Sequence, residues 1–542
     1  MLRDDWRESA GWLLAAALLA VIVLGYVMPV TGYLSATPGD LGDTRYNSMV
    51  LEHLYRVVTG HHAGLWDPEV FYPFKGMLAF SDNHLGSGAT YVLARLLGLS
   101  REQALNTWFI AGTLLNFAAA LYVLRRLGVS TASAALGAFF FAFAVPVPAQ
   151  GDHLQLVHRF AAPLAVLALW QMFERRRVAD LARVVFFTVW QFYCSIYLGL
   201  FLAYLLAALG VAILIVRKPF GWPRWRANLA AEPVPARLVA GGILLGSALA
   251  FAYLASSYYL ISRSYGLWRR VDEITEMLPR AGSYLLADHS PLLAWLGRGV
   301  SVPMRWEHQM FIGFGALALI LAAVVWRRSA AVPGLTQAML IALALLIAGT
   351  LWVDGMSFYS LVVWLPGIEV IRAVSRIILI MLVPMSVLVA LGADALWHRL
   401  GRTLPAKVTV LAGLAALLVV EPLTVATRGT PIAQWRSRLD AVKALLPPAV
   451  PKDAILFVRT SSTDFLEQIM SELDAMLLGQ DLGYPVLNGF SAFTPPGYGL
   501  RPCASARERL IGYSRALGGI DISAYSSRLV VVDQGTCPAE AR

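Results

Sequence analysis

The chain has 542 residues, of which 58% are hydrophobic and only 14% are charged. Soluble globular proteins carry roughly a quarter charged residues, so this composition excludes an ordinary soluble globule. The net charge of +10 would indicate nucleic-acid binding only if the basic residues gathered on one solvated face, whereas here they lie between apolar runs. The composition therefore predicts a polytopic protein in contact with a lipid bilayer and without a nucleic-acid partner.

Apolar runs long enough to be considered as membrane spans recur along most of the chain. A spanning helix needs about 20 mainly apolar residues. The first run is too long for a signal peptide and no clear cleavage site follows it, so we expect it to be retained as a helix. The predicted apolar spans lie at 12–34, 104–124, 131–147, 160–174, 184–216, 238–260, 310–326, 336–353, 376–396 and 407–426.

The run 184–216 is long for one span and short for two. A single span would leave the following basic residues Lys218, Arg224 and Arg226 outside, whereas a tight hairpin near 195–200 returns them to the cytoplasm. With the hairpin we expect about eleven spans, the N-terminus inside and the C-terminus outside. Lys and Arg are then nearly threefold denser in the inner loops than in the outer loops, as the positive-inside rule requires.

Three outer segments are too long to be simple connectors: 35–103, 261–309 and the tail from 427. In the first, the pieces 47–58 and 89–97 are expected to lie along the membrane surface. The tail has strand-like patterns at 454–458 and 529–532 and a helical pattern at 463–478. We therefore predict an all-α transmembrane domain, 1–426, followed by a small extracytoplasmic α/β domain, 427–542.

The three cysteines cannot form a disulfide framework, and no zinc-site spacing occurs among them. Cys194 lies in an apolar run and is expected to be inert. Cys503 and Cys537 both lie in the tail, where they form a disulfide if the compartment is oxidising and stay reduced if it is not. The sequence leaves both alternatives open.

Acidic and histidine residues gather in the first two outer loops. Asp40 and Asp43 follow the first span, where two glycines permit a turn that aims a carboxylate toward the membrane. The alternative is that Asp43 only caps the next helix. Further candidates for a second acid or for binding the acceptor or sugar are Asp82, His84, Asp152, His153 and His158.

A divalent cation such as Mg²⁺ or Mn²⁺ could use the same loops, with Asp43 and Asp152 as ligands. The ligands are dispersed and match no standard spacing, so solvated loop residues are the alternative. We expect no other cofactor.

Arginines near the outer helix ends are candidates for binding a phosphate. Arg372 and Arg376 are four residues apart and can share one helical face, and Arg263, Arg269 and Arg270 follow another outer helix end. A guanidinium in this position is costly unless it is paired, and a phosphate is a natural partner for it. The alternative is that these side chains reach to lipid headgroups.

At Gly39-Asp-Leu-Gly-Asp-Thr-Arg-Tyr46 the sequence resembles the first outer loop of the GT-C class of membrane glycosyltransferases. The mannosyltransferase and aminoarabinose-transferase branches carry such an acidic motif followed by an aromatic residue, and the layout is also similar to that of YfhO-like bacterial membrane proteins. The resemblance extends over residues 1–426 and includes Phe71-Tyr-Pro73 and Ile371-Arg-Ala-Val-Ser-Arg376. It implies that Asp43 takes the position of the catalytic acid, with Asp40 as the alternative. The chain lacks the WWD-type motif of the oligosaccharyltransferase branch, which argues against a peptide acceptor.

The resemblance implies transfer of a hexosyl or pentosyl group from a polyprenyl-phosphate donor to a glycan, lipid or protein acceptor of the cell envelope. Asp43 would act as general base, and Arg372, Arg376, Arg269 and Arg270 would bind the donor phosphate. We expect the protein in the bacterial inner membrane with the site on the periplasmic face. A transporter or flippase is the main alternative, although the ionisable residues lie toward helix ends rather than at mid-span. The other alternative is a non-catalytic envelope assembly protein.

Overall fold

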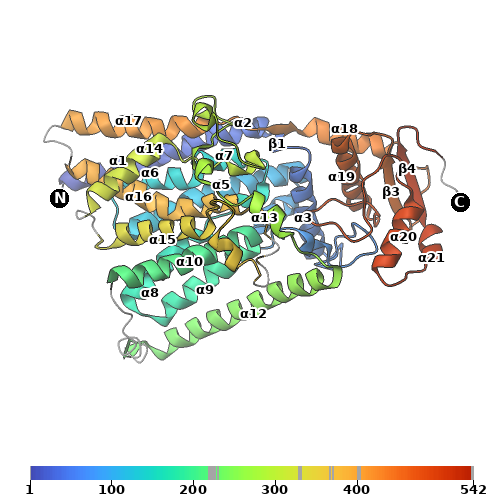
Figure 1. Cartoon of the computed structure of the whole chain (residues 1–542), viewed down its shortest axis with the longest axis horizontal. Coiled ribbons are helices and arrows are strands. Elements are labelled where there is room, and N and C mark those ends of the chain that lie inside the picture. The colour runs from blue at the N-terminus through green and yellow to red at the C-terminus, as the bar shows by residue number, and fades with distance from the viewer. Residues whose placement is uncertain are drawn as a thin grey trace.

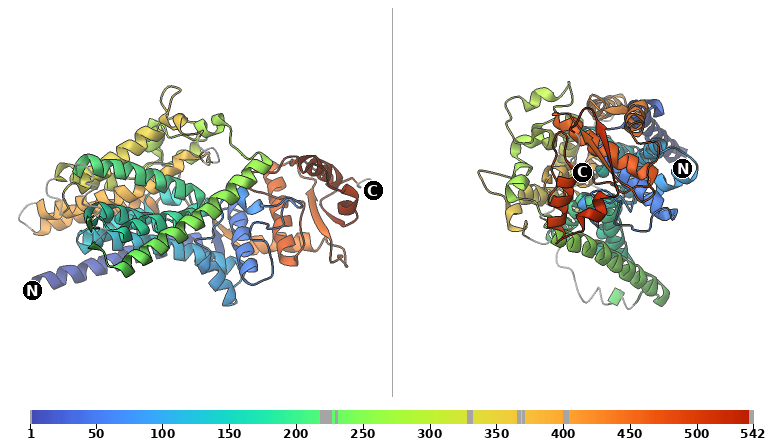
Figure 2. Two further views of the ribbon diagram at one scale, coloured as in Figure 1. Left: turned by 90° about the horizontal axis from the view of Figure 1, so that it is seen from below. Right: turned by 90° about the vertical axis from the view of Figure 1, so that its right-hand side faces the viewer.

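The computed structural model describes residues 2–217, 227–228, 231–327, 332–364, 368, 371–399 and 404–538. A bundle of long helices forms most of an elongated molecule, and the C-terminal segment 427–538 covers one end of it (Figure 1). The described ends of the chain lie at opposite ends of the long axis, and the views in Figure 2 agree. The basic residues on which the hairpin prediction depends, Lys218, Arg224 and Arg226, lie outside the described residues. So do Arg328 and Arg402 of two other predicted inner loops.

The helices of the bundle account for most of the described chain. The elements up to the second outer loop are α1 (Leu2–Ile22), the π-helix η1 (Val23–Val27), α2 (Met28–Val30), η2 (Gly32–Leu34), β1 (Ala36–Pro38), α3 (Asp43–Val58), η3 (Met77–Phe80), α4 (Ala89–Leu96), α5 (Arg101–Arg126), α6 (Thr131–Phe143), α7 (Pro146–Ala149) and η4 (Leu154–Leu156). The next elements are α8 (Ala161–Arg175), α9 (Val178–Cys194), α10 (Ile196–Arg217), α12 (Val234–Tyr265), α13 (Val271–Glu276), η5 (Ala281–Leu285), η6 (Ala294–Gly297), η7 (Arg305–His308), α14 (Phe314–Val325), α15 (Leu335–Thr350), η9 (Phe358–Leu361), η10 (Val374–Ile377), α16 (Ile378–Arg399) and α17 (Leu404–Leu423).

Several of these helices are long and apolar enough to cross a membrane. Within the described residues there are seven such segments: Trp6–Val30, Arg101–Arg126, Thr131–Ala149, Leu154–Arg175, Ile196–Arg217, Val234–Tyr265 and Val374–Arg399. Two shorter apolar helices, α14 and α15, lie beside them in the bundle (Figure 1). The chain is therefore a helical protein with several membrane-spanning helices, and the total of eleven spans stays a prediction.

The apolar run 184–216 is divided into two helices, as predicted. Helix α9 ends at Cys194, Ser195 is extended, and α10 begins at Ile196. Asp82 from the first outer loop accepts hydrogen bonds from the Ile196 N–H and from Ser195 Oγ. A carboxylate at this position is stabilised by the free N–H groups of a helix start, which explains why the helix begins there.

Helix α16 lies at the centre of the bundle, and its most apolar window is entirely buried. It packs against α6, α14 and α15. Gly392 allows the contact with α14, because a Cβ atom there would lie 1.8 Å from the Leu319 carbonyl oxygen. A larger residue at 392 would force these two helices apart.

The C-terminal segment consists of β2 (Gly429–Pro431), α18 (Ile432–Lys443), β3 (Ile455–Thr460), α19 (Phe465–Leu482), α20 (Ala506–Ala516), α21 (Ile522–Ser526) and β4 (Leu529–Gln534). The strands and the helix that the sequence indicated are β3, β4 and α19. Strands β3 and β4 pair in parallel, with Ile455 opposite Leu529 and Thr460 opposite Gln534. The helix α19 lies between them in the chain, as a parallel pair requires.

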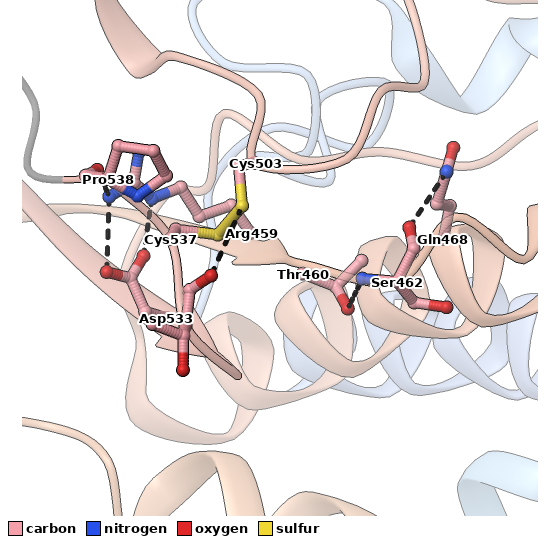
Figure 3. Close-up of a disulfide and its surroundings, with 9 residues drawn as sticks. Arg459, Thr460, Ser462, Gln468, Cys503, Asp533, Cys537 and Pro538 are labelled. Carbon is pink, nitrogen blue, oxygen red and sulfur yellow. Dashed lines mark hydrogen bonds and ion pairs between the residues drawn. A yellow bond between two sulfur atoms is a disulfide. The ribbon is translucent and has the colours of Figure 1, made fainter.

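A disulfide joins Cys503 to Cys537, which decides the alternative that the sequence left open (Figure 3). It ties the end of the described chain to the loop before α20. Arg459 on β3 forms an ion pair with Asp533 on β4 and donates to the Pro538 carbonyl at 2.9 Å. The third cysteine, Cys194, is reduced and buried, as expected.

The C-terminal segment has a small hydrophobic core of its own and shares a larger one with the first outer loop. The small core is formed by Val442, Val458, Ala475, Leu478 and Val532. One hydrophobic cluster contains Met49, Val50 and Phe71 of the first outer loop together with Ile455 and Leu477 of the C-terminal segment. Strand β1 also pairs antiparallel with β2. Helix α3, expected on the membrane surface, is instead buried along most of its length between the bundle and α19.

Candidate active site

The turn that carries Asp40 and Asp43 is held between the bundle and the start of the C-terminal segment. Gly39 N–H donates to the Arg428 carbonyl at 2.9 Å, and Thr430 Oγ1 donates to the Gly39 carbonyl at 2.8 Å. Gly39 has φ +83°, and a Cβ atom there would lie 2.3 Å from Thr44 Oγ1. A glycine is therefore required at this turn. Asp43 is the first residue of α3.

Asp43 belongs to a network of four charged or polar side chains, each from a different segment of the chain. His153 Nδ1 lies 3.0 Å from Asp43 Oδ2, and its Nε2 lies 2.9 Å from Arg376 Nη2. Arg376 also forms a two-pronged ion pair with Glu307, at 2.9 and 2.7 Å. Glu307 Oε1 lies 3.5 Å from His153 Nε2. The Asp43 side chain is 37% exposed, so one end of this network is open to a substrate.

The neighbours of each group set its charge. Burial raises the pKa of Asp43, but the hydrogen bond from His153 and the charges of His153 and Arg376 outweigh it and lower that pKa below its usual value. Burial and Arg376 lower the pKa of His153, but Asp43 and Glu307 outweigh them and raise it. Asp43 is thus a carboxylate at neutral pH, and its histidine partner readily takes up a proton.

Asp40 and Asp152 lie close to Asp43 without joining the ion pairs. Asp40 Oδ1 accepts from the Gly42 N–H at 2.9 Å, and the Cα atom of Asp152 lies 3.6 Å from the position of a Gly39 Cβ. Burial, together with the charges of Asp43 and Asp152, raises the pKa of Asp40. The environments of Asp40 and Asp43 therefore push their pKa values apart, which is typical of carboxylate pairs with different roles.

Glu307 was not among the residues that the sequence analysis selected. It lies in η7 between Trp306 and His308, at the end of the outer segment 261–309, and it is buried. An acidic residue between two aromatic rings just before a span was the signal that could have identified it. Its partner Arg376 is 69 residues away in the chain, which local patterns cannot connect.

Three other predicted residues are buried around Trp108 or at the start of α10. Asp82 caps α10, and burial raises its pKa to about 6. His84 Nε2 lies 2.6 Å from Asn47 Oδ1, and burial lowers its pKa to about 3. His158 Nε2 donates to the Trp108 carbonyl at 3.1 Å, and its ring packs on Trp108. The two histidines support the interior beneath the Asp43 network, while Asp82 reaches a neighbouring cavity.

A cavity of about 830 Å³ lies between α12, the start of α10 and the first outer loop. Its lining is mainly apolar and aromatic, and its polar groups include Asp82, Tyr197, Arg263 and Arg269. Tyr197 connects the cavity to the charged network, because its ring centroid lies 5.4 Å from the Arg376 guanidinium carbon. An apolar cavity with cations at one side suits an amphiphilic anion.

The predicted arginines are distributed over different surroundings. Arg269 and Arg263 line the cavity, and Arg372 lies close enough to Arg269 for its charge to lower the pKa of Arg269, although burial lowers it more. Arg270 is exposed and paired with Asp272 at 2.7 Å. Arg376 belongs to the Asp43 network. Residues 371–373 are not helical, so Arg372 and Arg376 do not share the helical face that their spacing suggested.

Within the described residues, no three His, Cys, Asp or Glu side chains gather in a way that could hold a metal ion. Asp43 is already engaged by His153, and Asp40 by the Gly42 N–H. The donor set at Asp43 and Asp152 therefore does not fit a complete cation site, and a bound Mg²⁺ or Mn²⁺ stays a prediction.

The fold of the chain is similar to that of solved structures, although no sequence match is found. No protein-family model and no curated protein sequence matches the chain. The Archaeoglobus fulgidus oligosaccharyltransferase in complex with Zn and sulfate superposes with a TM-score of 0.53 at 14% identity, over 88% of this chain and 62% of that one. Oligosaccharyltransferases are GT-C glycosyltransferases. The fold is similar to the GT-C fold.

Two further GT-C structures match less closely. Oligosaccharyltransferase AglB from A. fulgidus, in complex with an inhibitory peptide and a dolichol-phosphate, has a TM-score of 0.49 at 13% identity, over 91% of this chain and 65% of that one. ArnT from Cupriavidus metallidurans bound to undecaprenyl phosphate has a TM-score of 0.45 at 12% identity, over 96% and 90%. The chain spans less than two thirds of the length of both oligosaccharyltransferases. The GT-C resemblance expected from the sequence is thus confirmed for the fold.

Proposed function

We propose that the protein is a glycosyltransferase that moves a sugar from a polyprenyl-phosphate donor to an acceptor of the cell envelope, on the outer face of the membrane. The observation that carries this proposal is the partly exposed Asp43 carboxylate, held by His153 in a charged network. Through Arg376 and Tyr197 this network reaches an apolar cavity that is lined by arginines. The fold supports it, because it is similar to that of an oligosaccharyltransferase.

In the proposed reaction, an acceptor hydroxyl or amine attacks the anomeric carbon of the sugar. The new bond forms as the bond to the phosphate oxygen breaks, and the proton of the acceptor passes to Asp43. A positioned general base contributes typically 10²- to 10⁴-fold to the rate. The polyprenyl phosphate leaves with the bonding electrons, and its growing charge is stabilised by Arg269 and Arg372.

The partners of Asp43 have their own part in this proposal. The Nδ1–H of His153 holds the carboxylate in one orientation, and Glu307 and Arg376 hold the ring from the other side. A fixed carboxylate loses less entropy on reaching the acceptor than a freely rotating one.

The proposal is tested with Asp43→Asn in purified protein in detergent, supplied with a polyprenyl-phosphate sugar. Release of polyprenyl phosphate reports both transfer and hydrolysis, so the acceptor need not be known. We expect a loss of about 10²- to 10⁴-fold in kcat with an unchanged unfolding temperature, because asparagine cannot take the proton. Asp40→Asn is the matched control, and we expect a much smaller loss for it. Equal activity of the two variants would contradict the role of Asp43.

A further inference from the structure

A short piece of the C-terminal segment forms part of the cavity wall. Ala492 and Phe493 both line the cavity, although they lie far along the chain from its other walls. Phe493 N–H donates to the Phe80 carbonyl at 3.1 Å, which fixes the piece to the first outer loop. Tyr46 of α3 is also in contact with it, through a hydroxyl pair with Ser491 at 3.1 Å. The cavity is therefore completed by residues beyond the helical bundle.

The same piece holds the guanidinium of Arg269. Arg269 Nη2 donates to the Ala492 carbonyl, and the guanidinium carbon lies 4.0 Å from the centre of the Phe493 ring. Among the described residues, the only carboxylate that forms an ion pair with this guanidinium is that of Glu273, 3.6 Å from Nη1. The side chain is 13% exposed, and its Nε is buried without a hydrogen-bond partner in the described part of the chain.

The charge of Arg269 is costly in this position. Burial and the nearby charge of Arg372 both act against it and lower the pKa of Arg269. The face of an aromatic ring stabilises a guanidinium, more so when the pair is shielded from water. An anion between Arg269 and Arg372 would compensate both charges, and a phosphate matches the donor geometry of a guanidinium.

We propose that Phe493 is a positioning residue that holds Arg269 in place to bind the phosphate of a lipid-linked substrate. The C-terminal segment then contributes directly to donor binding. The inference rests on the proposed function, since it assigns the cavity to the donor. It also adds to that function, because residues outside the transmembrane bundle then determine donor affinity.

Binding in detergent tests this without catalysis, with polyprenyl phosphate as the probe and the corresponding polyprenol as its uncharged counterpart. We expect the wild type to bind the phosphate more tightly than the alcohol. Phe493→Leu keeps an apolar side chain but loses the ring face, so it should weaken phosphate binding about 3- to 30-fold and leave alcohol binding unchanged. Phe493→Trp keeps a ring face and should restore phosphate binding.

Phe465→Leu is the matched control, because Phe465 lies in the same segment but is 62% exposed and away from the cavity lining. We expect it to bind both lipids as the wild type does. In an Arg269→Lys background, Phe493→Leu should have a smaller effect than in the wild type, because the two residues act through one contact. In the release assay, the KM for the donor should rise and kcat should fall as well, because Arg269 also stabilises the charge that grows on the leaving phosphate.

Three outcomes would overturn the inference. If the wild type prefers the phosphate and Phe493→Leu binds it equally well, the inference fails while the proposed function stands. An equal loss for phosphate and alcohol would mean that Phe493 only shapes the cavity. If the wild type does not distinguish the two lipids, the proposed donor class fails and the inference fails with it.

Discussion

At the scale of single residues, the chemistry of Asp43 is set by side chains that surround it. Its hydrogen bond to His153 and the charge of Arg376 keep it ionised, whereas Asp40, three residues earlier, has its pKa raised by burial and by two neighbouring carboxylates. The pKa values of two aspartates in the same turn are therefore shifted in opposite directions. That difference is the reason to assign the base role to Asp43 rather than to Asp40.

His153 provides a prediction that depends on pH. Its pKa is raised in the folded protein, and a group of this kind stabilises the fold while it is protonated. The contribution is fully present below the unfolded value of about 6.5 and is lost as the pH rises through the folded value. Thermal unfolding in detergent should therefore show the largest advantage of the wild type over His153→Gln below about pH 6.5.

The exposed His61 offers the control for this prediction. His61→Gln should leave the pH dependence of the unfolding temperature as it is in the wild type, because no carboxylate in the described part of the chain forms an ion pair with the His61 ring. An advantage of the wild type over His153→Gln that stays constant across the pH range would contradict the account of His153.

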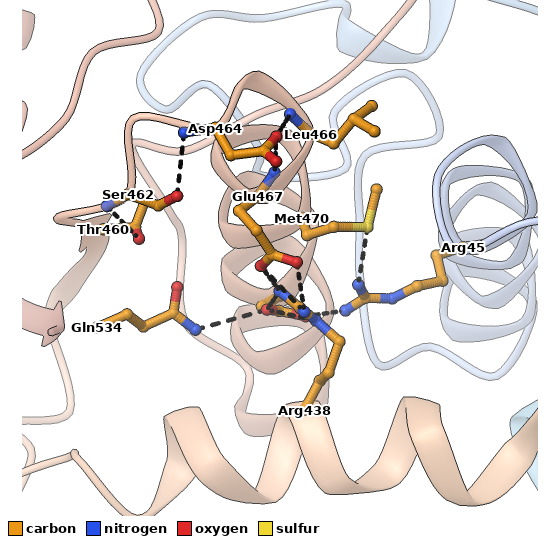
Figure 4. Close-up of polar contacts among 10 residues, drawn as sticks. Arg45, Arg438, Thr460, Ser462, Asp464, Leu466, Glu467, Met470 and Gln534 are labelled. Atoms are coloured by element: carbon orange, nitrogen blue, oxygen red, sulfur yellow. Dashed lines mark hydrogen bonds and ion pairs between the residues drawn. The ribbon is translucent and has the colours of Figure 1, made fainter.

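At the scale of elements, α3 is the link between the bundle and the C-terminal segment. Asp43 begins this helix, and Arg45, two residues later, forms an ion pair with Asp474 on α19 in which both side chains are 0% exposed. Arg438 on α18 reaches the same part of α19 and pairs with Asp474 at 2.9 Å and with Glu467 at 3.1 Å (Figure 4). These contacts fix α3, and with it Asp43, relative to α19.

Asp474→Asn should destabilise this junction strongly. The change leaves the Arg45 guanidinium buried without its counter-charge, and breaking a buried pair by removing one partner costs roughly 3–5 kcal/mol. We expect a decrease of that size in the free energy of unfolding, measured by denaturant titration in mixed micelles. Release of polyprenyl phosphate should fall too, because α3 carries Asp43.

Glu508→Gln is the control for Asp474→Asn, since Glu508 also pairs with an arginine of the C-terminal segment but is exposed. Exposed pairs contribute less than about 1 kcal/mol, so its unfolding free energy should stay close to that of the wild type. If both variants were equally stable, the Arg45 pair would not be what joins the two elements.

At the scale of the whole molecule, one hydrophobic cluster spans the first outer loop and the C-terminal segment, and β1 pairs with β2 across the same junction. The far end of the segment is tied down by the Cys503–Cys537 disulfide. The described ends of the chain lie at opposite ends of the long axis (Figure 1). Their orientation relative to the membrane stays a prediction, and a disulfide is stable only in an oxidising compartment.

Removing the disulfide provides the prediction at this scale. The bridge closes a loop between positions 34 residues apart, and a native disulfide of this kind contributes typically about 2–4 kcal/mol. The double variant Cys503→Ser, Cys537→Ser should unfold at a lower temperature than the wild type, and a reductant should lower the wild type to the same value. Cys194→Ser should respond to the reductant as the wild type does. Thiol labelling in intact cells that finds Cys503 and Cys537 reduced would contradict the outer placement.

Local features of the chain were predictable from the sequence alone. The apolar runs and the strand and helix patterns of the tail follow from hydropathy and periodicity over short windows. The division of 184–216 into two helices follows from its length and from the basic residues after it. The acidic turn with Asp43 was also identified, because two glycines and two carboxylates directly after a span are visible in one short stretch. These properties depend on neighbours in the chain.

Only the tertiary structure decided which residues meet. The contacts Asp43–His153, Glu307–Arg376 and His153–Arg376 join positions 110, 69 and 223 residues apart, and no periodicity carries information over such distances. The same holds for the burial of α3 by α19 and for the contact of Phe493 with Arg269. The sequence by itself thus determined the class of protein and the turn where its proposed base lies, while packing of distant segments determined the partners that hold that base and complete the cavity beside it.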